Sequence, residues 1–147
     1  MAWEFKATRR VEFSETDMAG LMHFSHFFRF METAEHAFYR SLGFSVVPKD
    51  HRPPLGFPRV HVACDFKKPV RFEDVLEVHL LVREKKSKSI TYLFRFRNLS
   101  LAAPEEVARG TMTVVCVIHH ADGKLASVPI PEEISKQIEV APAEMLE

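Results

Sequence analysis

One stretch decides the fold, Phe24 to Gly43, with the sequence FSHFFRFMETAEHAFYRSLG. Its apolar residues recur every three or four positions, which is the spacing of one face of an α-helix. Gly43 ends the pattern, so we expect a helix over about 24–42. Three further apolar residues widen this face and predict a helix covered on more than one side: Phe30, Ala37 and Tyr39.

Segments on both sides of this helix alternate apolar and polar residues with the period of two that is typical of β-strands. The first runs from Trp3 to Phe13, with Arg9 interrupting its apolar row. After a proline-rich loop at 46–58, further strands are predicted near 60–66, 76–82, 90–96 and 107–119, and a short one at 124–128. The strand at 107–119 is the most continuously apolar, so we expect it in the centre of the sheet. A short helix at 132–138 follows, and the tail beyond Pro142 is expected to fray.

One long helix and five or six antiparallel strands make an α+β domain, for which 147 residues are sufficient. Only the sheet can cover so many Phe side chains, so we expect it to wrap the helix. The other face of the sheet is also partly apolar, at Val75, Leu81 and Leu93. Small proteins usually hide a second apolar face in an oligomer, which predicts a homodimer or homotetramer.

The overall composition excludes several classes of protein. Twenty basic residues balance 20 acidic ones, so no net charge attracts nucleic acid or an acidic membrane. The longest apolar run, Val114 to Ile118, is too short to span a bilayer, and the first residues lack the apolar segment of a signal peptide. Cys64 and Cys116 lie in apolar strand patterns, which is typical of buried free thiols in a reducing compartment. We therefore expect a cytoplasmic protein.

A polar turn directly before the helix contains Asp17 and ends at Gly20, a residue that permits close approach of the backbone. The start of a helix offers free N–H groups and the positive end of the helix dipole. A carboxylate beside such a helix start matches half of an acyl-transfer site. Asp17 would be the nucleophile or the base, and the N–H groups would form an oxyanion hole. The alternative is that Asp17 only caps the turn.

Several segments, taken in order, resemble the hotdog-fold acyl-CoA thioesterases, specifically the 4-hydroxybenzoyl-CoA thioesterase group. The similarity covers most of the chain: Val11 to Phe13, Glu15 to Gly20, then Phe27, Arg29 and Glu32 in the helix, then 60–69, 72–75 and 84–89. The Asp-x-x-Gly turn before an aromatic helix is its most specific part. The resemblance implies a hotdog fold, in which a five- to six-stranded antiparallel sheet wraps a long central helix, as a single domain over 1–147.

The resemblance also implies an activity, the hydrolysis of an acyl-CoA thioester to a carboxylic acid and free coenzyme A. Asp17 would be nucleophile or general base, the Phe24 backbone N–H the oxyanion donor, and Gly20 would shape the approach. Such sites lie at dimer interfaces, and the dimers often pair into tetramers. No metal or redox cofactor is needed. The sequence departs from its relatives at His23, where they usually have an aromatic residue, and at Phe24 and Phe27, where tyrosines are common.

Further residues are predicted to bind substrate. Lys85, Lys86 and Lys88, with Ser89, would contact the phosphates of coenzyme A, unless they form only a solvated hairpin. Phe24, Phe27 and Phe57 are candidates for lining the acyl pocket. Glu32 would face the acyl end of that pocket, or else form an ion pair with Arg29 or with a neighbouring subunit.

His23 and His26 lie three residues apart at the helix start, but two histidines are too few for a structural zinc site. His23 is therefore predicted to be a pocket-lining or auxiliary acid/base group, with a simple polar helix start as the alternative. Two rival functions stay open. One is release of acyl chains from acyl carrier protein, and the other is a catalytically silent hotdog domain that binds acyl thioesters or serves as an oligomeric scaffold.

Overall fold

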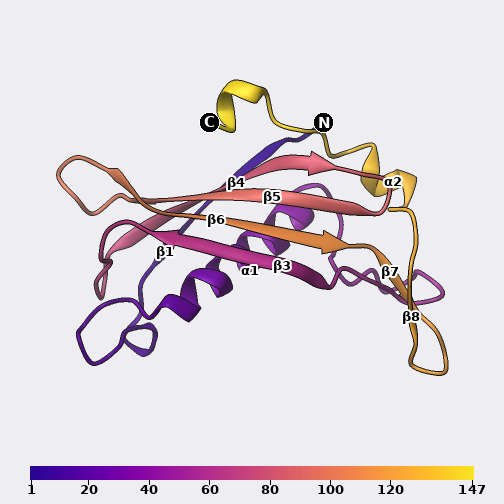
Figure 1. Ribbon diagram of the computed structural model, residues 1–147, viewed down its shortest axis with the longest axis horizontal. Coiled ribbons are helices and arrows are strands. Elements are labelled where there is room, and N and C mark those ends of the chain that lie inside the picture. The colour runs from indigo at the N-terminus through magenta and orange to yellow at the C-terminus, as the bar shows by residue number, and fades with distance from the viewer.

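The computed structural model describes residues 1–147, and a long helix, α1 (Phe24–Ser41), packs against one face of its main sheet (Figure 1). That sheet has five antiparallel strands in the order β1-β4-β5-β6-β3. Their bounds are β1 Glu4–Arg10, β3 Arg59–Phe66, β4 Val75–Lys85, β5 Ser89–Asn98 and β6 Glu105–Val115. A smaller sheet has the order β2-β7-β8, with β2 Leu55–Gly56, β7 Val117–His119 and β8 Leu125–Ser127. The predicted α+β class is confirmed.

α1 forms where the apolar spacing predicts it because one wide face is buried against the sheet. Phe30, Met31, Phe38 and Tyr39 are fully buried. Phe24, in the first turn, is 57% exposed, so the sheet does not cover the start of the helix. No helix is long and apolar enough to cross a membrane.

β1 ends at Arg10, three residues before the predicted end of the first strand. Phe13 instead begins a 3-10 turn, η1 (Phe13–Glu15), and its side chain is exposed. Arg9, which interrupts the apolar row, lies 4.2 Å from the centre of the Phe30 ring and donates to the buried Glu15 carboxylate, with Nη2 and Oε2 3.0 Å apart. Arg9 thus fastens the segment before α1 to the helix itself.

The segment predicted as one central strand, 107–119, forms two strands in two sheets. β6 lies beside the edge strand β3 rather than in the centre, which β5 occupies. At Cys116 the chain passes from one sheet to the other, and the Cys116 N–H donates to the Lys88 carbonyl. Cys116 and Cys64 are free thiols, as predicted, and burial raises the pKa of Cys116 to about 11.

The chain itself covers the sheet face opposite α1 (Figure 1). Leu81 and Leu93, which motivated the predicted oligomer, are buried because Ala141 and the partly buried Trp3, Met145 and Leu146 pack against them. The prediction that the tail frays is therefore wrong: its 3-10 turn η2 (Ala143–Met145) packs on this face. The short helix α2 (Glu132–Ser135) precedes it, ending earlier than predicted.

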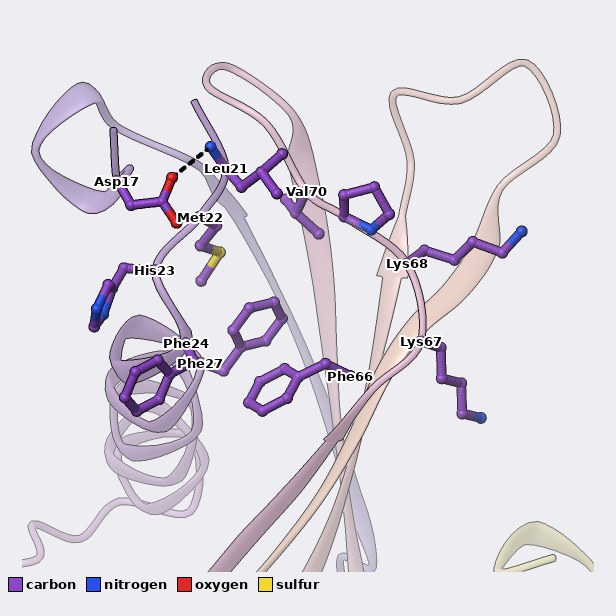
Figure 2. A pocket seen from close by; sticks show the side chains of 11 residues that line it. Asp17, Leu21, Met22, His23, Phe24, Phe27, Phe66, Lys67, Lys68 and Val70 are labelled. Atoms are coloured by element: carbon purple, nitrogen blue, oxygen red, sulfur yellow. Dashed lines mark hydrogen bonds between the residues drawn. The ribbon is translucent and has the colours of Figure 1, made fainter. Parts of the chain in front are cut away.

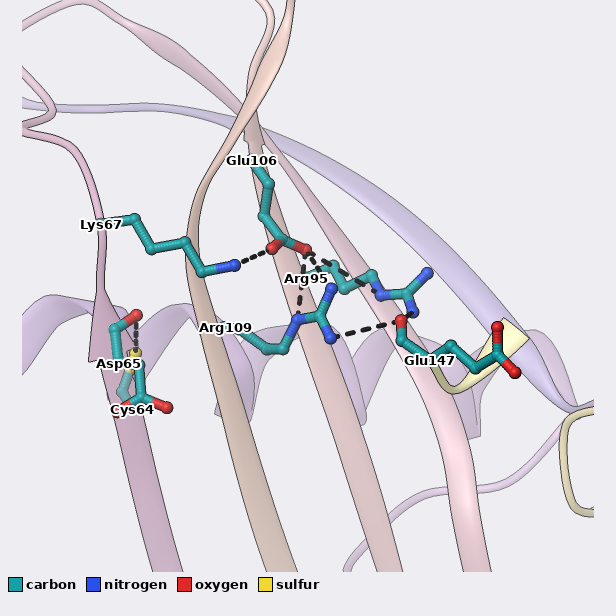
Figure 3. A network of polar contacts seen from close by, with 7 residues as sticks. All are labelled: Cys64, Asp65, Lys67, Arg95, Glu106, Arg109 and Glu147. Atoms are coloured by element: carbon teal, nitrogen blue, oxygen red, sulfur yellow. Dashed lines mark hydrogen bonds and ion pairs between the residues drawn. The ribbon is translucent and has the colours of Figure 1, made fainter. Parts of the chain in front are cut away.

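A network of ion pairs fastens the end of this tail (Figure 3). Glu106 accepts hydrogen bonds from Lys67 and Arg109, and Arg95 and Arg109 donate to the Glu147 backbone oxygen. Partial burial would raise the pKa of Glu106, but the hydrogen bonds from Lys67 and Arg109 outweigh it and hold that pKa below its usual value. The C-terminal tail is thus held on the outer face of the sheet by polar as well as apolar contacts.

The uncovered part of the molecule is the edge strand β3. It pairs with β6 on one side only, while Val60, Val62 and Phe66 are 60%, 39% and 48% exposed. Folded proteins usually cover or blunt an apolar edge strand, because its unpaired backbone groups can pair with another chain. β3 is therefore an exposed apolar edge of the main sheet.

Candidate active site

The turn that contains Asp17 is closed by its own backbone. The Asp17 N–H donates to the Leu21 carbonyl at 2.8 Å, and the Gly20 N–H donates to the Asp17 carbonyl at 3.0 Å. Gly20 has a φ of 79°, a left-handed conformation that favours glycine. The Met22 N–H donates to the Val70 carbonyl at 2.7 Å, which fixes the turn to the segment that precedes β4. The position of Asp17 is thus set by backbone contacts on both sides.

The Asp17 carboxylate uses one oxygen and leaves the other free. Oδ1 accepts from the Ala19 N–H at 2.8 Å and from the Leu21 N–H at 3.1 Å. Oδ2 accepts no hydrogen bond from the chain, and the residue is exposed. Oδ1 therefore caps the turn, as the alternative interpretation of Asp17 predicts, while Oδ2 remains available to a ligand.

A cavity of about 390 Å³, the Asp17 cavity, opens beside this carboxylate (Figure 2). It is lined by Asp17, Leu21 and Met22 of the turn, by His23, Phe24 and Phe27 at the start of α1, and by residues 66–70. Figure 2 shows Phe27 and Phe66 facing each other between α1 and β3, and their ring centres are 5.1 Å apart. Lys67 and Lys68 lie on the opposite side from Asp17. An apolar floor with one carboxylate on its wall suits an acyl group whose reactive carbon is at Asp17.

The start of α1 supplies a hydrogen-bond donor at this cavity. His23 is the N-cap, and its Nδ1 accepts from the Ser25 N–H at 3.3 Å. Nδ1 of a capping imidazole needs a lone pair for that contact, so a neutral His23 has its proton on Nε2. The Phe24 N–H donates to no group of the chain. It is therefore free to donate to a ligand, with the helix dipole favouring negative charge there.

His23 is thus a polar residue that caps the helix start, and its ring also lines the cavity. Its ring centre is 6.4 Å from that of His26. The chain has no group of three or more His, Cys, Asp or Glu side chains arranged as a metal site.

A second depression, the outer hollow, lies on the other side of Asp17. Its volume is about 640 Å³, and it is lined by Phe13, Thr16, Asp17, Met18, Gly20 and Phe72. The Phe13 and Phe72 rings meet edge to face with centres 5.9 Å apart, and Met18 is fully exposed. The Asp17 carboxylate therefore stands between two partly apolar depressions.

The predicted phosphate-binding hairpin does not approach Asp17 within one chain. Lys85 donates to the carbonyls of Ser135 and Ile138 at 2.9 and 2.7 Å, so it holds the C-terminal segment and is not a free phosphate ligand. Lys86 lies 3.2 Å from Glu84. Ser89 is level with Val115, at the end of the sheet opposite Phe66, which is level with Ala108. Lys86, Lys88 and Ser89 could reach a thioester at Asp17 only from a second subunit.

Two other predicted pocket residues, Phe57 and Glu32, do not line the Asp17 cavity itself. Phe57 is buried against Tyr39, with ring centres 5.6 Å apart, and does not line the Asp17 cavity. Glu32 lies 3.6 Å from Arg59, so the predicted ion pair forms with a strand residue and not with Arg29.

Sequence reasoning missed Phe66, Lys67 and Lys68, although Phe66 ends a predicted strand and two lysines follow it. It also missed a buried ion pair: Glu35 is fully buried, and its Oε1 lies 2.5 Å from Arg59 Nη2. Burial raises the pKa of Glu35 to about 7, although Arg59 acts to lower it. Glu35 Oε2 has no hydrogen-bond partner. The available signal was a carboxylate among the apolar positions of the helix.

Comparison with known proteins identifies the family of the chain. The family model of the thioesterase-like superfamily matches residues 11–138. A protein of Aquifex aeolicus named as an esterase is 35% identical over 123 residues, which cover 82% of this chain and 88% of that protein. The structure of a gentisyl-coenzyme A thioesterase is 30% identical, with a TM-score of 0.75, covering 89% of this chain and 99% of the other.

The structure of 4-hydroxybenzoyl CoA thioesterase from Pseudomonas sp. strain CBS-3 shares the fold at 17% identity, with a TM-score of 0.79 and coverage of 92% and 99%. The predicted hotdog fold and the predicted enzyme class, a thioester hydrolase, are confirmed. The chain belongs to the thioesterase-like superfamily.

Proposed function

We propose that this protein is an acyl-CoA thioesterase in which Asp17 is the reactive carboxylate. The observation that supports this most strongly is the pairing of two groups at one cavity. Asp17 Oδ2 is free while Oδ1 is held by backbone N–H groups, and the Phe24 N–H at the helix start has no partner. Cytoplasmic location and independence of metal or redox cofactors stay predictions.

The reaction needs attack on the thioester carbonyl and stabilisation of the charge that develops on its oxygen. Asp17 either attacks the carbonyl carbon directly or removes a proton from the attacking water. The Phe24 N–H then donates to the oxyanion, a contact that contributes about 3 kcal/mol in other enzymes. The carbon–sulfur bond then breaks, and the thiolate of coenzyme A leaves and takes up a proton. On the general-base route the attacking water has already made the acyl group a carboxylic acid. On the direct route the acyl group is left as an anhydride on Asp17, and a water molecule hydrolyses this anhydride to release the carboxylic acid and restore the Asp17 carboxylate.

The two depressions on either side of Asp17 suggest how the substrate lies. The acyl group would occupy the Asp17 cavity, where Phe27 and Phe66 provide apolar contacts. The arm that carries the leaving sulfur would cross the outer hollow over Phe13, Met18 and Phe72. A relative that is 30% identical is described as acting on gentisyl-coenzyme A, which supports coenzyme A as the leaving group.

A second copy of the chain would complete this site. The open apolar edge of β3 supports a homodimer formed through that strand, and two dimers could pair into a homotetramer. Lys86 and Lys88 of the second subunit would then be the candidates for the coenzyme A phosphates. Sedimentation at micromolar concentration tests this, and a protein that is only monomeric would contradict it.

The rival enzyme function, release of acyl groups from acyl carrier protein, uses the same thioester chemistry. Lys68 lines the cavity and is about half exposed, and exposed Arg71 follows it, so these two cations could receive an acidic carrier, whereas Lys67 is held by Glu106. Comparing kcat/KM for one acyl group on coenzyme A and on the carrier separates the two functions.

The direct test is a thiol-release assay over short, long, branched and aromatic acyl-CoAs, with the Asp17→Asn variant as the control. We expect turnover of at least one thioester by the wild-type protein and strong loss in the variant. Binding of acyl-CoA without any turnover would support the catalytically silent domain instead.

A further inference from the structure

A smaller depression, the far hollow, lies between α1 and β3, as the Asp17 cavity does. Its volume is about 180 Å³, and it is lined by Phe28, Arg29, Glu32, Arg59, Val62 and Met112. Val62 and Phe66 are four residues apart in β3, so their side chains lie on the same face of the strand. Phe27 and Phe28 are neighbours in α1. Residues of α1 and β3 therefore line both depressions, and we call the space between these two elements the α1–β3 groove.

A β-bulge turns Arg59 into this groove. In the β3–β6 pairing, Arg59 is opposite Val114 and His61 is opposite Thr113, so Val60 has no partner. In a regular strand Arg59 would share the outer face with His61 and Ala63. The extra residue reverses the alternation, and bulges often re-aim a side chain in this way. Arg59 consequently reaches the carboxylates of α1 on the inner side of the sheet.

Arg59 is held rigidly at this position. Its Nη2 lies 2.5 Å from Glu35 Oε1 and 3.6 Å from Glu32 Oε1, and its Nη1 donates to the Phe57 carbonyl at 2.9 Å. The groove is lined by apolar side chains at Phe66, Phe27, Phe28 and Val62, and ends at this charged group. An apolar chain that reached Arg59 would displace the water that still solvates the partly exposed side chains of Arg59 and Glu32 and would offer neither a hydrogen bond in return, which is unfavourable.

We propose that the acyl group of the substrate runs from Asp17 along this groove, and that Arg59 is a specificity-determining residue that limits its length. This inference rests on the proposed function. Phe24 and Glu32 are eight residues apart, so the helix advances about 12 Å between them. An extended chain covers that distance in about ten bonds, given about 3.6 Å for three backbone bonds. The upper limit is therefore an acyl group of about ten carbons.

The test measures kcat/KM over straight-chain acyl-CoAs from butanoyl to hexadecanoyl in three variants. Val62→Phe should fill the far hollow and shorten the preferred chain. Its activity on decanoyl-CoA should fall about tenfold, the effect of about two buried methylene groups, while butanoyl-CoA is unaffected. Arg59→Ala combined with Glu32→Gln and Glu35→Gln removes all three charges at the end of the groove and should raise activity on tetradecanoyl-CoA. Leu125→Phe is the control, because Leu125 is exposed in β8, lines neither depression and should leave the profile unchanged.

Circular dichroism and sedimentation of each variant establish that fold and assembly are retained. A Val62→Phe protein that is folded and has the wild-type length profile would overturn the inference and leave the proposed function intact. A wild-type profile that rises without a break beyond tetradecanoyl-CoA would do the same. A wild-type protein that hydrolyses no acyl-CoA would overturn the proposed function, and the inference with it.

Discussion

The two carboxyl groups of Asp17 and Glu35 lie in opposite environments. Asp17 is exposed, and its Oδ1 accepts two backbone N–H groups in the turn before α1. Glu35 is fully buried in the middle of α1, beside Arg59, and burial raises its pKa to about 7. The Asp17 carboxylate accepts hydrogen bonds from backbone N–H groups, and the oxygen of a carboxamide could accept the same bonds. The Glu35 carboxylate instead depends on one ionic partner, Arg59. Substitution of Asp17 should therefore affect mainly catalysis, and substitution of Glu35 mainly stability.

The largest effect is expected for Asp17→Asn. Asparagine can accept the same N–H groups through its carbonyl oxygen, but it has neither the charge nor the basicity of a carboxylate. We expect kcat to fall at least about 100-fold, the lower end for loss of general-base help. The thermal midpoint should change little. Both quantities are to be measured on the same sample.

A folded Asp17→Asn oligomer with near-normal turnover would contradict the catalytic role of Asp17. Suspicion would then pass to His23, which lines the same cavity, or to Glu32 in the far hollow.

The Glu35→Gln variant should change the pH dependence of stability. In the folded protein the pKa of Glu35 is raised from 4.5 to about 7, so folding binds a proton between these pH values. The stabilisation from this proton is fully present below pH 4.5 and is lost as pH rises to about 7. The wild-type free energy of unfolding, relative to that of the variant, should therefore fall by about 3 kcal/mol across this window.

Urea unfolding of both proteins between pH 4.5 and 8 measures this difference. A difference that does not vary with pH would show that Arg59 holds Glu35 ionised throughout. Glu35 would then be no different from an ordinary surface carboxylate in its linkage to folding.

The sequence was sufficient for features that depend on neighbouring residues. α1 is set by its apolar spacing and by Gly43, and the Asp17 turn by a polar run that ends in glycine, so both could be located within two residues. The fold could be predicted from these features because the apolar side chains of such a helix must be buried, and only the sheet is large enough to cover them.

Features that depend on contacts between distant segments could not be predicted. Lys85 looked like a free lysine in a hairpin, but the last 15 residues supply the carbonyls that bind it. Leu81 and Leu93 looked exposed because nothing in the strand pattern shows that the tail returns to cover them. Arg59 reaches Glu35 only because of a bulge, and a one-residue irregularity leaves no clear sign in the alternation.

A smaller effect is expected for Gly20→Ala, for which the chain offers a matched control in Gly123→Ala. Both glycines have positive φ, 79° and 85°, and no atom lies within 4 Å of an added Cβ at either one. Each alanine should therefore cost about 1 kcal/mol of stability through backbone strain alone. Only Gly20→Ala should also lower kcat, because only that turn holds Asp17. Equal loss of kcat in both variants would show that activity follows global stability and not the geometry of the turn.

The smallest effect is expected for the hairpin, where Lys86→Ala and Lys88→Ala are combined and Lys85 is left in place. Lys85 is excluded because its loss would release the C-terminal segment and confuse binding with folding. Exposed ionic contacts of this kind contribute about 0.2–0.5 kcal/mol each, so loss of two should raise KM for acyl-CoA about two- to fivefold at low salt. kcat should stay constant, because contacts with the remote phosphates act equally in the ground state and the transition state. The rise in KM should shrink as salt is added, since screening weakens exposed ion pairs in the wild-type protein as well. An unchanged KM at low salt would show that these two lysines do not bind coenzyme A and belong only to a solvated hairpin. Another surface would then have to bind coenzyme A.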